Sequence, residues 1–381
     1  MDFSFSEDQI AIRDLAHQIF TDRTTDEFMS AFDKTDQVYD DALWTTLAEQ
    51  GLLGVSIPEA FGGTGFGFSE LCLVLEEQGR RISPLPLYSS LVLGALPIAE
   101  FGTDAQKEKY LKPLAQGGMK LTAAIAELGM SDAVAGQVRA AKNGAHWILT
   151  GSLDCVPDSP AADAIIVPVQ VDGAQTVFIV DTSYPGLTID PQRTSLGTNE
   201  GTLTLDGVSV PSEAILGTVG QGNEILEWLE MRAETAICAM QVGVTEEALK
   251  RTAQFTCERK QFGAPIGSFQ AVAMQAADAF IDVEAIRSIY WLALYKLNSG
   301  QDARAEVRSA KWYASDAGHR IVYRTQHLHG GMGVDLEYPS HRFFLWAKHL
   351  GMMLGGRSVQ ISKLGALLAS DDTVGLAALE L

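Results

Sequence analysis

The spacing of hydrophobic positions changes twice along the chain and divides it into three regions. Residues 1–118 carry apolar side chains at helical spacing, as in the run from Ile10 to Ile19 that follows Ser6, a residue type that caps helices. Residues 119–220 contain short runs rich in β-branched residues, separated by Gly, Asp and Pro. The helical spacing returns in residues 221–381.

The last region contains long helical runs in the number of a helix bundle: Glu224 to Phe255, Ser268 to Leu297, Ala303 to His327 and Ser340 to Ser370. The pattern predicts an α+β chain of three domains. They are an N-terminal α-helical domain (1–118), a middle β-domain (119–220) and a C-terminal four-helix-bundle domain (221–381).

Composition narrows the class of protein. The formal net charge is −20 over 381 residues, which argues against a nucleic-acid partner because phosphate binding needs a basic surface. The four cysteines lie far apart without a CxxC pair, so neither a zinc site nor a redox dithiol is indicated, and we predict no metal site. The acidic N-terminus lacks signal-peptide features, and no apolar run has the length of a membrane span. We expect a cytoplasmic protein.

Two short segments of the last region carry the candidate chemistry. In the first, Glu258 to Gln270, the guanidinium of Arg259 can bind a phosphate and the amide of Gln270 can bind a polar edge. Its glycines let a ligand approach the backbone closely. The second, His327 to Gly333, contains a Gly-Gly turn. Together they predict a nucleotide-binding cradle between helices.

These segments, with others in the same order, resemble the acyl-CoA dehydrogenase family. Its members use FAD to form a 2,3-double bond in acyl-CoA thioesters. The matching segments are Pro58 to Gly67 (PE-x-x-GG-x-G), Arg259 to Gln270 (R-x-x-FG…Q), Gly330 to Gly333 (GG-x-G) and Glu337 to Pro339 (E-Y-P). The resemblance covers nearly the whole chain. It implies a helical domain, a β-barrel and a four-helix bundle.

The resemblance also indicates that the catalytic base is missing. The reaction needs a carboxylate that removes a proton from C2 of the acyl chain. Leu354 occupies the place where most members carry this glutamate, and a leucine is no base. A minority of members place the base on the first bundle helix, and that place is Ala233 here. Glu230 and Glu234 lie close by, four residues apart on one helix face, so a shifted base at Glu234 or Glu230 stays open.

The segments that contact the flavin ring in the family are altered too. The family's TEP reads Ala126-Glu127-Leu128, and its SD pair is matched at Ser131-Asp132 in a shortened segment. The family's WIT, which packs against the isoalloxazine, reads Cys155-Val156-Pro157. Because a hydroxyl and an aromatic contact are lost, we expect a defective flavin pocket in this chain.

The elements that the family lends to the FAD of a neighbouring subunit are retained. They reach the adenine and pyrophosphate end of that cofactor, and His327 stands where a glutamine is usual. The resemblance therefore implies these cofactor-binding residues: Arg259, Phe262, Gln270, His327, Gly330 and Gly331.

In this chain the segments that the family lends to a neighbour's FAD are intact, whereas the segments that contact its own flavin are altered. This combination is typical of one subunit of an α2β2 acyl-CoA dehydrogenase. The partner would be a related chain that supplies the glutamate and most of the acyl-CoA pocket. The chain is most similar to non-catalytic subunits of bacterial enzymes that act on steroid side-chain CoA thioesters, and the family implies electron-transfer flavoprotein as acceptor. Two alternatives stay open: a self-sufficient homotetramer that uses Glu234 or Glu230, and a scaffold without FAD.

Overall fold

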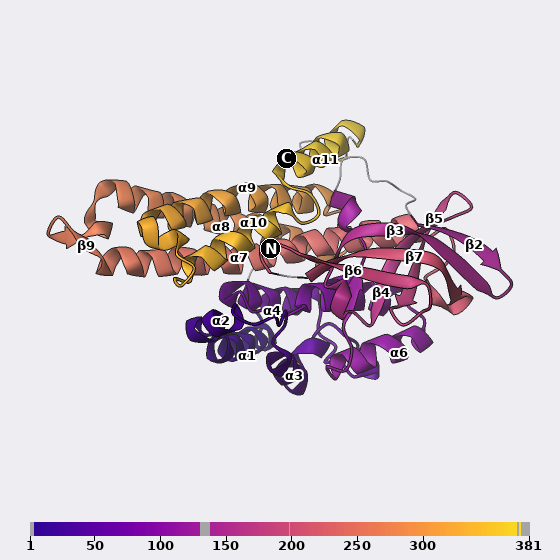
Figure 1. Cartoon of the computed structure of the whole chain (residues 1–381). Coiled ribbons are helices and arrows are strands. Elements are labelled where there is room, and N and C mark those ends of the chain that lie inside the picture. Colours follow the sequence, from indigo (N-terminus) through magenta and orange to yellow (C-terminus); the bar gives the residue numbers. More distant parts are fainter. Residues whose placement is uncertain (1–3, 130–137, 198, 372, 375–381) are drawn as a thin grey trace. The chain divides into compact units, whose positions relative to one another are not determined.

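The computed structural model forms two compact units (Figure 1). We call the first the bundle unit (Met1–Gln37, Cys72–Ser83, Glu234–Leu381) and the second the sheet unit (Val38–Leu71, Pro84–Ala233). The structure describes residues 4–129, 138–197, 199–371 and 373–374. Helices and a central sheet confirm the predicted α+β class. The domain boundaries at 118 and 220 stay a prediction.

The sheet unit is built on one eight-stranded sheet in the described residues, with strand order β6-β7-β3-β2-β4-β5-β8 and β1 paired to β4. Neighbours are antiparallel except β2 with β4 and β1 with β4. The strands are β1 (Leu121–Ala123), β2 (Val138–Asn143), β3 (His146–Pro157), β4 (Ala164–Val171), β5 (Ala174–Asp181), β6 (Leu187–Arg193), β7 (Asn199–Pro211) and β8 (Ile215–Leu216). The β-rich runs of the sequence are confirmed in β4, β5 and β7.

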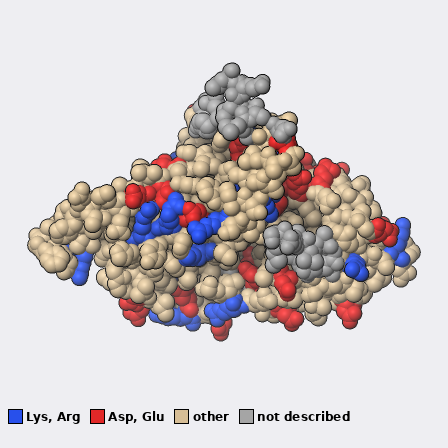
Figure 2. Space-filling view, turned by 90° about the horizontal axis from the view of Figure 1, so that it is seen from above, with Lys and Arg blue, Asp and Glu red and all other residues tan. Residues whose placement is uncertain are grey.

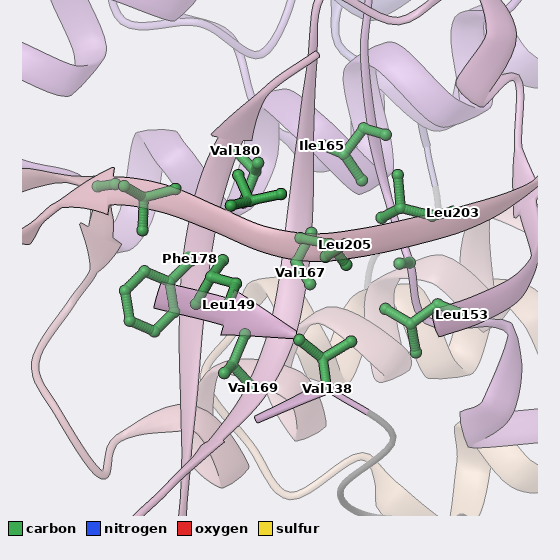
Figure 3. Packing of buried hydrophobic residues seen from close by; sticks show 14 of the residues in the cluster. Val138, Leu149, Leu153, Ile165, Val167, Val169, Phe178, Val180, Leu203 and Leu205 are labelled. Carbon is green, nitrogen blue, oxygen red and sulfur yellow. The ribbon is translucent and has the colours of Figure 1, made fainter. Parts of the chain in front are cut away.

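Side chains from neighbouring strands fill the core of the sheet unit (Figure 3). Val167 and Phe178 stand opposite each other on β4 and β5, and both are fully buried. Trp147 of β3 meets Phe178 edge-on, with ring centroids 6.1 Å apart. The described helices of this unit include α3 (Asp41–Glu49), α5 (Leu96–Phe101) and α6 (Asp104–Ala115).

The described helices of the bundle unit include α1 (Glu7–Arg23), α2 (Asp26–Phe32), α8 (Gln270–Asn298), α9 (Arg304–His329), α10 (Ser340–Met352) and α11 (Arg357–Ser370). The end of α4 (Phe68–Arg81) and most of α7 (Gly222–Glu258) also belong to it. None of the described helices combines the length and apolarity of a membrane span.

The prediction of one helical run from Ser340 to Ser370 is wrong. The chain breaks between α10 and α11, where Leu354 and Gly355 adopt left-handed conformations with φ of +52° and +92°. A left-handed residue ends a helix because it turns the chain out of the hydrogen-bonding ladder. The other three long runs are confirmed in α7, α8 and α9.

Glycines allow α4 and α7 to cross in close contact. A Cβ placed at Gly243 would lie 1.9 Å from the carbonyl oxygen of Glu76, and one at Gly79 would lie 2.3 Å from that of Met240. Only glycine fits at such distances. Ion pairs surround the crossing, with the guanidinium of Arg287 3.0 Å from Glu76.

Candidate functional site

The predicted arginine segment forms a hairpin at the end of α7. The backbone N–H of Arg259 still donates to the carbonyl of Phe255, after which β9 (Lys260–Gln261) pairs with β10 (Ala264–Pro265). Phe262 and Gly263 make the two-residue turn, with φ of +53° and +82°. A non-glycine residue is uncommon there, and Phe262 is also 95% exposed. The turn therefore holds an aromatic ring out in the solvent.

The second predicted segment lies at the same end of the bundle unit. The rings of Phe255 and His329 stack with centroids 4.5 Å apart, which joins the end of α7 to the end of α9. Gly330 follows with φ of +61°, and a Cβ at Gly330 or Gly331 would meet nothing within 4 Å. The backbone of this turn is therefore open to a ligand.

Three of the predicted cofactor-binding residues at this end have polar side chains that are available to a ligand. Arg259, Gln270 and His327 are exposed, and their side chains make no ion pair or hydrogen bond with any described residue. A guanidinium, an amide and an imidazole beside this open turn form a donor set suited to phosphate oxygens. The structure thus places the predicted cofactor-binding residues at one end of one unit.

Several other arginines of the bundle unit are already paired with carboxylates. Figure 2 shows Lys and Arg side chains gathered over the helical part of one face. Arg324 of α9 lies 2.7 Å from Asp282, which also receives Arg320, and Arg357 lies 2.8 Å from Asp316. Because carboxylates match these cations, they are poorer candidates for a phosphate than Arg259.

The position at which we predict the family's base holds a buried aliphatic side chain. Leu354 is 7% exposed, and its carbonyl oxygen accepts a hydrogen bond of 2.8 Å from the amide Nε2 of Gln360. The same Nε2 lies 2.6 Å from Glu234 Oε1. The turn between α10 and α11 is therefore tied to α7 through Gln360, with no acid–base group at residue 354.

Glu234 is fully buried in the bundle unit. Its Oε1 accepts a hydrogen bond of 2.6 Å from Nη1 of Arg308, which lies on α9. A glutamate on a helix usually faces solvent, and Glu234 does not. Glu230 is also buried, on the part of α7 that belongs to the sheet unit.

Sequence reasoning missed Lys311 of α9, which supports the Leu354 turn. Its buried ammonium donates to the carbonyls of Leu350, Gly351 and Gly355 at 3.3 Å each, and to Ser315 Oγ at 3.0 Å. Burial lowers the pKa of Lys311 to about 8. The signal was present, because Lys311 falls at an apolar-spaced position between Val307 and Ala314 of its helix.

Acidic residues lie beside the segment that we predict to be an altered flavin contact, Cys155-Val156-Pro157. Cys155 is exposed on β3, with φ of +54°. Asp158 accepts hydrogen bonds from the hydroxyls of Tyr39 (2.8 Å) and Ser89 (2.5 Å), and burial raises its pKa. Burial, and then the nearby Asp158, raise the pKa of Glu200. The predicted match at Ser131-Asp132 lies outside the described residues.

Comparison with known proteins assigns the family. Residues 6–118 match the model for the acyl-CoA dehydrogenase N-terminal domain, and residues 220–368 match that for the C-terminal domain. The chain belongs to the acyl-CoA dehydrogenase family, and is thus of the class of FAD-dependent oxidoreductases. It is 34% identical over 378 residues to acyl-CoA dehydrogenase FadE27 of Mycobacterium tuberculosis, covering 97% of this chain and 99% of that protein.

Two similar solved structures are of complexes. The Tcur3481–Tcur3483 steroid ACAD variant has a chain 41% identical to this one, with a TM-score of 0.88 and coverage of 95% and 98%. The ChsE4–ChsE5 complex of Mycobacterium tuberculosis has a chain 34% identical, with a TM-score of 0.91 and coverage of 97% and 100%. These likenesses support the resemblance to heteromeric steroid enzymes.

Proposed function

We propose that this chain is the non-catalytic subunit of a heteromeric α2β2 acyl-CoA dehydrogenase. It completes the FAD site of a related partner chain, and that partner supplies the catalytic glutamate and most of the acyl-CoA pocket. One observation carries the proposal: Arg259, Gln270 and His327 have no partner in the described chain, whereas the base position holds buried Leu354. The chain offers contacts outward and lacks the base itself.

The donor residues fit one end of FAD. When bound, FAD accepts the hydride that leaves C3 of the acyl chain. The guanidinium of Arg259 would bind a pyrophosphate oxygen, and the open backbone at Gly330 and Gly331 lets a phosphate or ribose approach. The exposed ring of Phe262 would cover apolar cofactor or partner surface, which gives its strained backbone a reason.

The partner, substrate and acceptor follow from likeness. The two complexes above support a partner chain, and the first is described as a steroid ACAD, so a steroid side-chain CoA thioester is the proposed substrate class. Electron-transfer flavoprotein is the proposed electron acceptor. The self-sufficient alternative would need Glu234 or Glu230 as base. The ion pair that Glu234 makes with Arg308 supports a structural role instead.

The proposal is tested by changing the donor arginine in the assembled complex. We expect Arg259→Gln to weaken FAD binding by about tenfold to a hundredfold, because a charge-assisted hydrogen bond contributes about 1.5–3 kcal/mol. Lys260→Gln, which removes the neighbouring exposed cation, is the matched control and should retain FAD. The readout is FAD affinity from titration of the apo-complex. Equal affinities for the two variants would contradict the assignment and favour a chain that acts as a scaffold and makes no contact with the FAD.

A further inference from the structure

A recess of about 260 Å³ in the bundle unit has no role in the function proposed above. It lies where the end of α7 meets the start of α2 and the segment before α10. Its walls include Asp26, Arg251, Phe255, Glu258, His329 and Tyr338. A water molecule occupies about 30 Å³ in the liquid, so the recess has room for a group as large as a long side chain.

Aromatic rings form one wall of the recess. His329 stacks on Phe255 at 4.5 Å and packs against Tyr338 with ring centroids 5.3 Å apart. The faces of such rings carry partial negative charge and attract cations. This wall therefore favours a positively charged group.

The one described cation of the recess is already neutralised. Arg251 binds both carboxylate oxygens of Asp26, at 2.9 and 2.8 Å, and its Nε binds Glu247 at 2.9 Å. Two carboxylates thus surround one guanidinium. Arg251 is therefore unable to neutralise a further acid in the recess.

Glu258 lacks a cation among the described residues. Its side chain receives only a neutral hydrogen bond, 2.9 Å long, from the amide of Gln254. Glu258 is exposed and is the last residue of α7, so it lies at the negative end of the helix dipole, which attracts cations. A cation in the recess would therefore meet a countercharge there.

His329 adds a hydrogen-bond acceptor to the recess. Its Nδ1 lies 2.8 Å from the carbonyl oxygen of Thr325, and because a carbonyl only accepts, Nδ1 carries the proton. Nε2 then holds a lone pair, and it is buried with no partner among the described residues. Burial lowers the pKa of His329, which favours the neutral ring in which Nε2 is an acceptor.

We propose that this recess binds an ammonium or guanidinium group, supplied by a small organic amine or by a Lys or Arg side chain of a neighbouring subunit. Glu258 provides the countercharge, the rings of Phe255 and Tyr338 provide the faces, and His329 Nε2 accepts a hydrogen bond. Glu258 directly precedes Arg259, and His329 directly precedes Gly330. An occupant of the recess would therefore hold in place the residues next to both predicted cofactor-binding segments. The binding site itself does not depend on the partner-subunit assignment.

The test uses the protein in its native assembly, with agmatine as the cationic probe and butylurea as a neutral planar control. Calorimetry should show agmatine binding at least about tenfold tighter than butylurea, since only agmatine is charged. Glu258→Gln should weaken agmatine by a similar factor, and Phe255→Leu should weaken it without changing charge. Glu49→Gln, which removes an exposed carboxylate of α3, is the control and should bind as the unaltered protein does.

The two sources of the cation give different results. Agmatine binding that is lost in Glu258→Gln identifies a site for a free amine. No agmatine binding, together with a lower subunit-dissociation midpoint for Glu258→Gln than for Glu49→Gln, identifies a side chain of a neighbouring subunit as the occupant. If agmatine does not bind and the two variants dissociate alike, or if Glu258→Gln binds agmatine normally, the proposal is wrong.

Discussion

Leu354 shows at the scale of one residue why restoring a carboxylate is not enough. The residue is buried in a left-handed turn, and Gln360 links its carbonyl to the buried carboxylate of Glu234. We predict that Leu354→Glu in this chain alone creates no acyl-CoA dehydrogenase turnover, because we expect the flavin pocket at Cys155 to be defective as well. A dye-coupled turnover assay measures this. Leu354→Gln is the control, because glutamine has the shape of glutamate without its carboxylate. Substantial turnover by the Leu354→Glu variant without a partner chain would contradict this account.

Glu234 should matter for stability rather than for proton transfer. Glu234→Gln leaves the Arg308 guanidinium without its carboxylate, and breaking a buried pair in this way costs about 3–5 kcal/mol. We expect a lower unfolding midpoint but an unchanged rate per bound FAD in the complex. Adding Arg308→Met should recover part of the stability. A rate loss of about a hundredfold or more in the single variant would instead identify Glu234 as the base.

The sequence predicts single residues unevenly. The sequence alone indicates that residue 354 is no base, because an aliphatic side chain has no atom that can accept a proton. The burial of Glu234 is not, since its partners Arg308 and Gln360 lie 74 and 126 residues further along the chain. Local spacing carries no information about such long-range pairs.

At the scale of elements, the crossing of α4 and α7 depends on a missing side chain. We predict that Gly243→Ala destabilises the protein by about 1–3 kcal/mol, because its Cβ would meet the backbone of Glu76, which has nowhere to move. Gly365→Ala on α11 is the matched control. Its Cβ meets nothing within 4 Å, so that change should be neutral or mildly stabilising. Chemical denaturation measures both, and equal effects would contradict the close crossing.

Lys311 should give the α10–α11 turn a measurable pH dependence. Its pKa is about 8 in the folded chain against an ordinary 10.5, so the folded state is penalised while the ammonium is charged in both states. As pH rises from about 8 to 10.5, the protein should gain up to about 3 kcal/mol of stability relative to Lys311→Met. Unfolding free energies of the two proteins across this range give the difference. A constant difference would show that Lys311 does not titrate as inferred.

Element boundaries were the weaker part of the sequence prediction. The long helices follow from apolar spacing, but the break before α11 does not, because Met353 and Leu354 continue the apolar pattern. Only Gly355 and Gly356 hint at it, and glycine alone does not decide between a kink and an end. The hairpin turn at Phe262 was equally hidden, since aromatic residues rarely adopt positive φ.

For the whole molecule, the central claim is that this chain completes an FAD site that belongs to a partner chain. Arg259, Gln270 and His327 are exposed at one end of the bundle unit, and a buried leucine stands at the position predicted for the base. Neither feature suits a self-sufficient enzyme. Both suit a subunit whose partner supplies what is missing.

The most direct measurement is co-expression of this chain with a related partner chain, followed by FAD stoichiometry and native mass. The account predicts a mixed tetramer with half an FAD per chain, and a chain that binds no FAD when produced alone. A stable homotetramer of this chain with one FAD per chain and turnover of its own would contradict it.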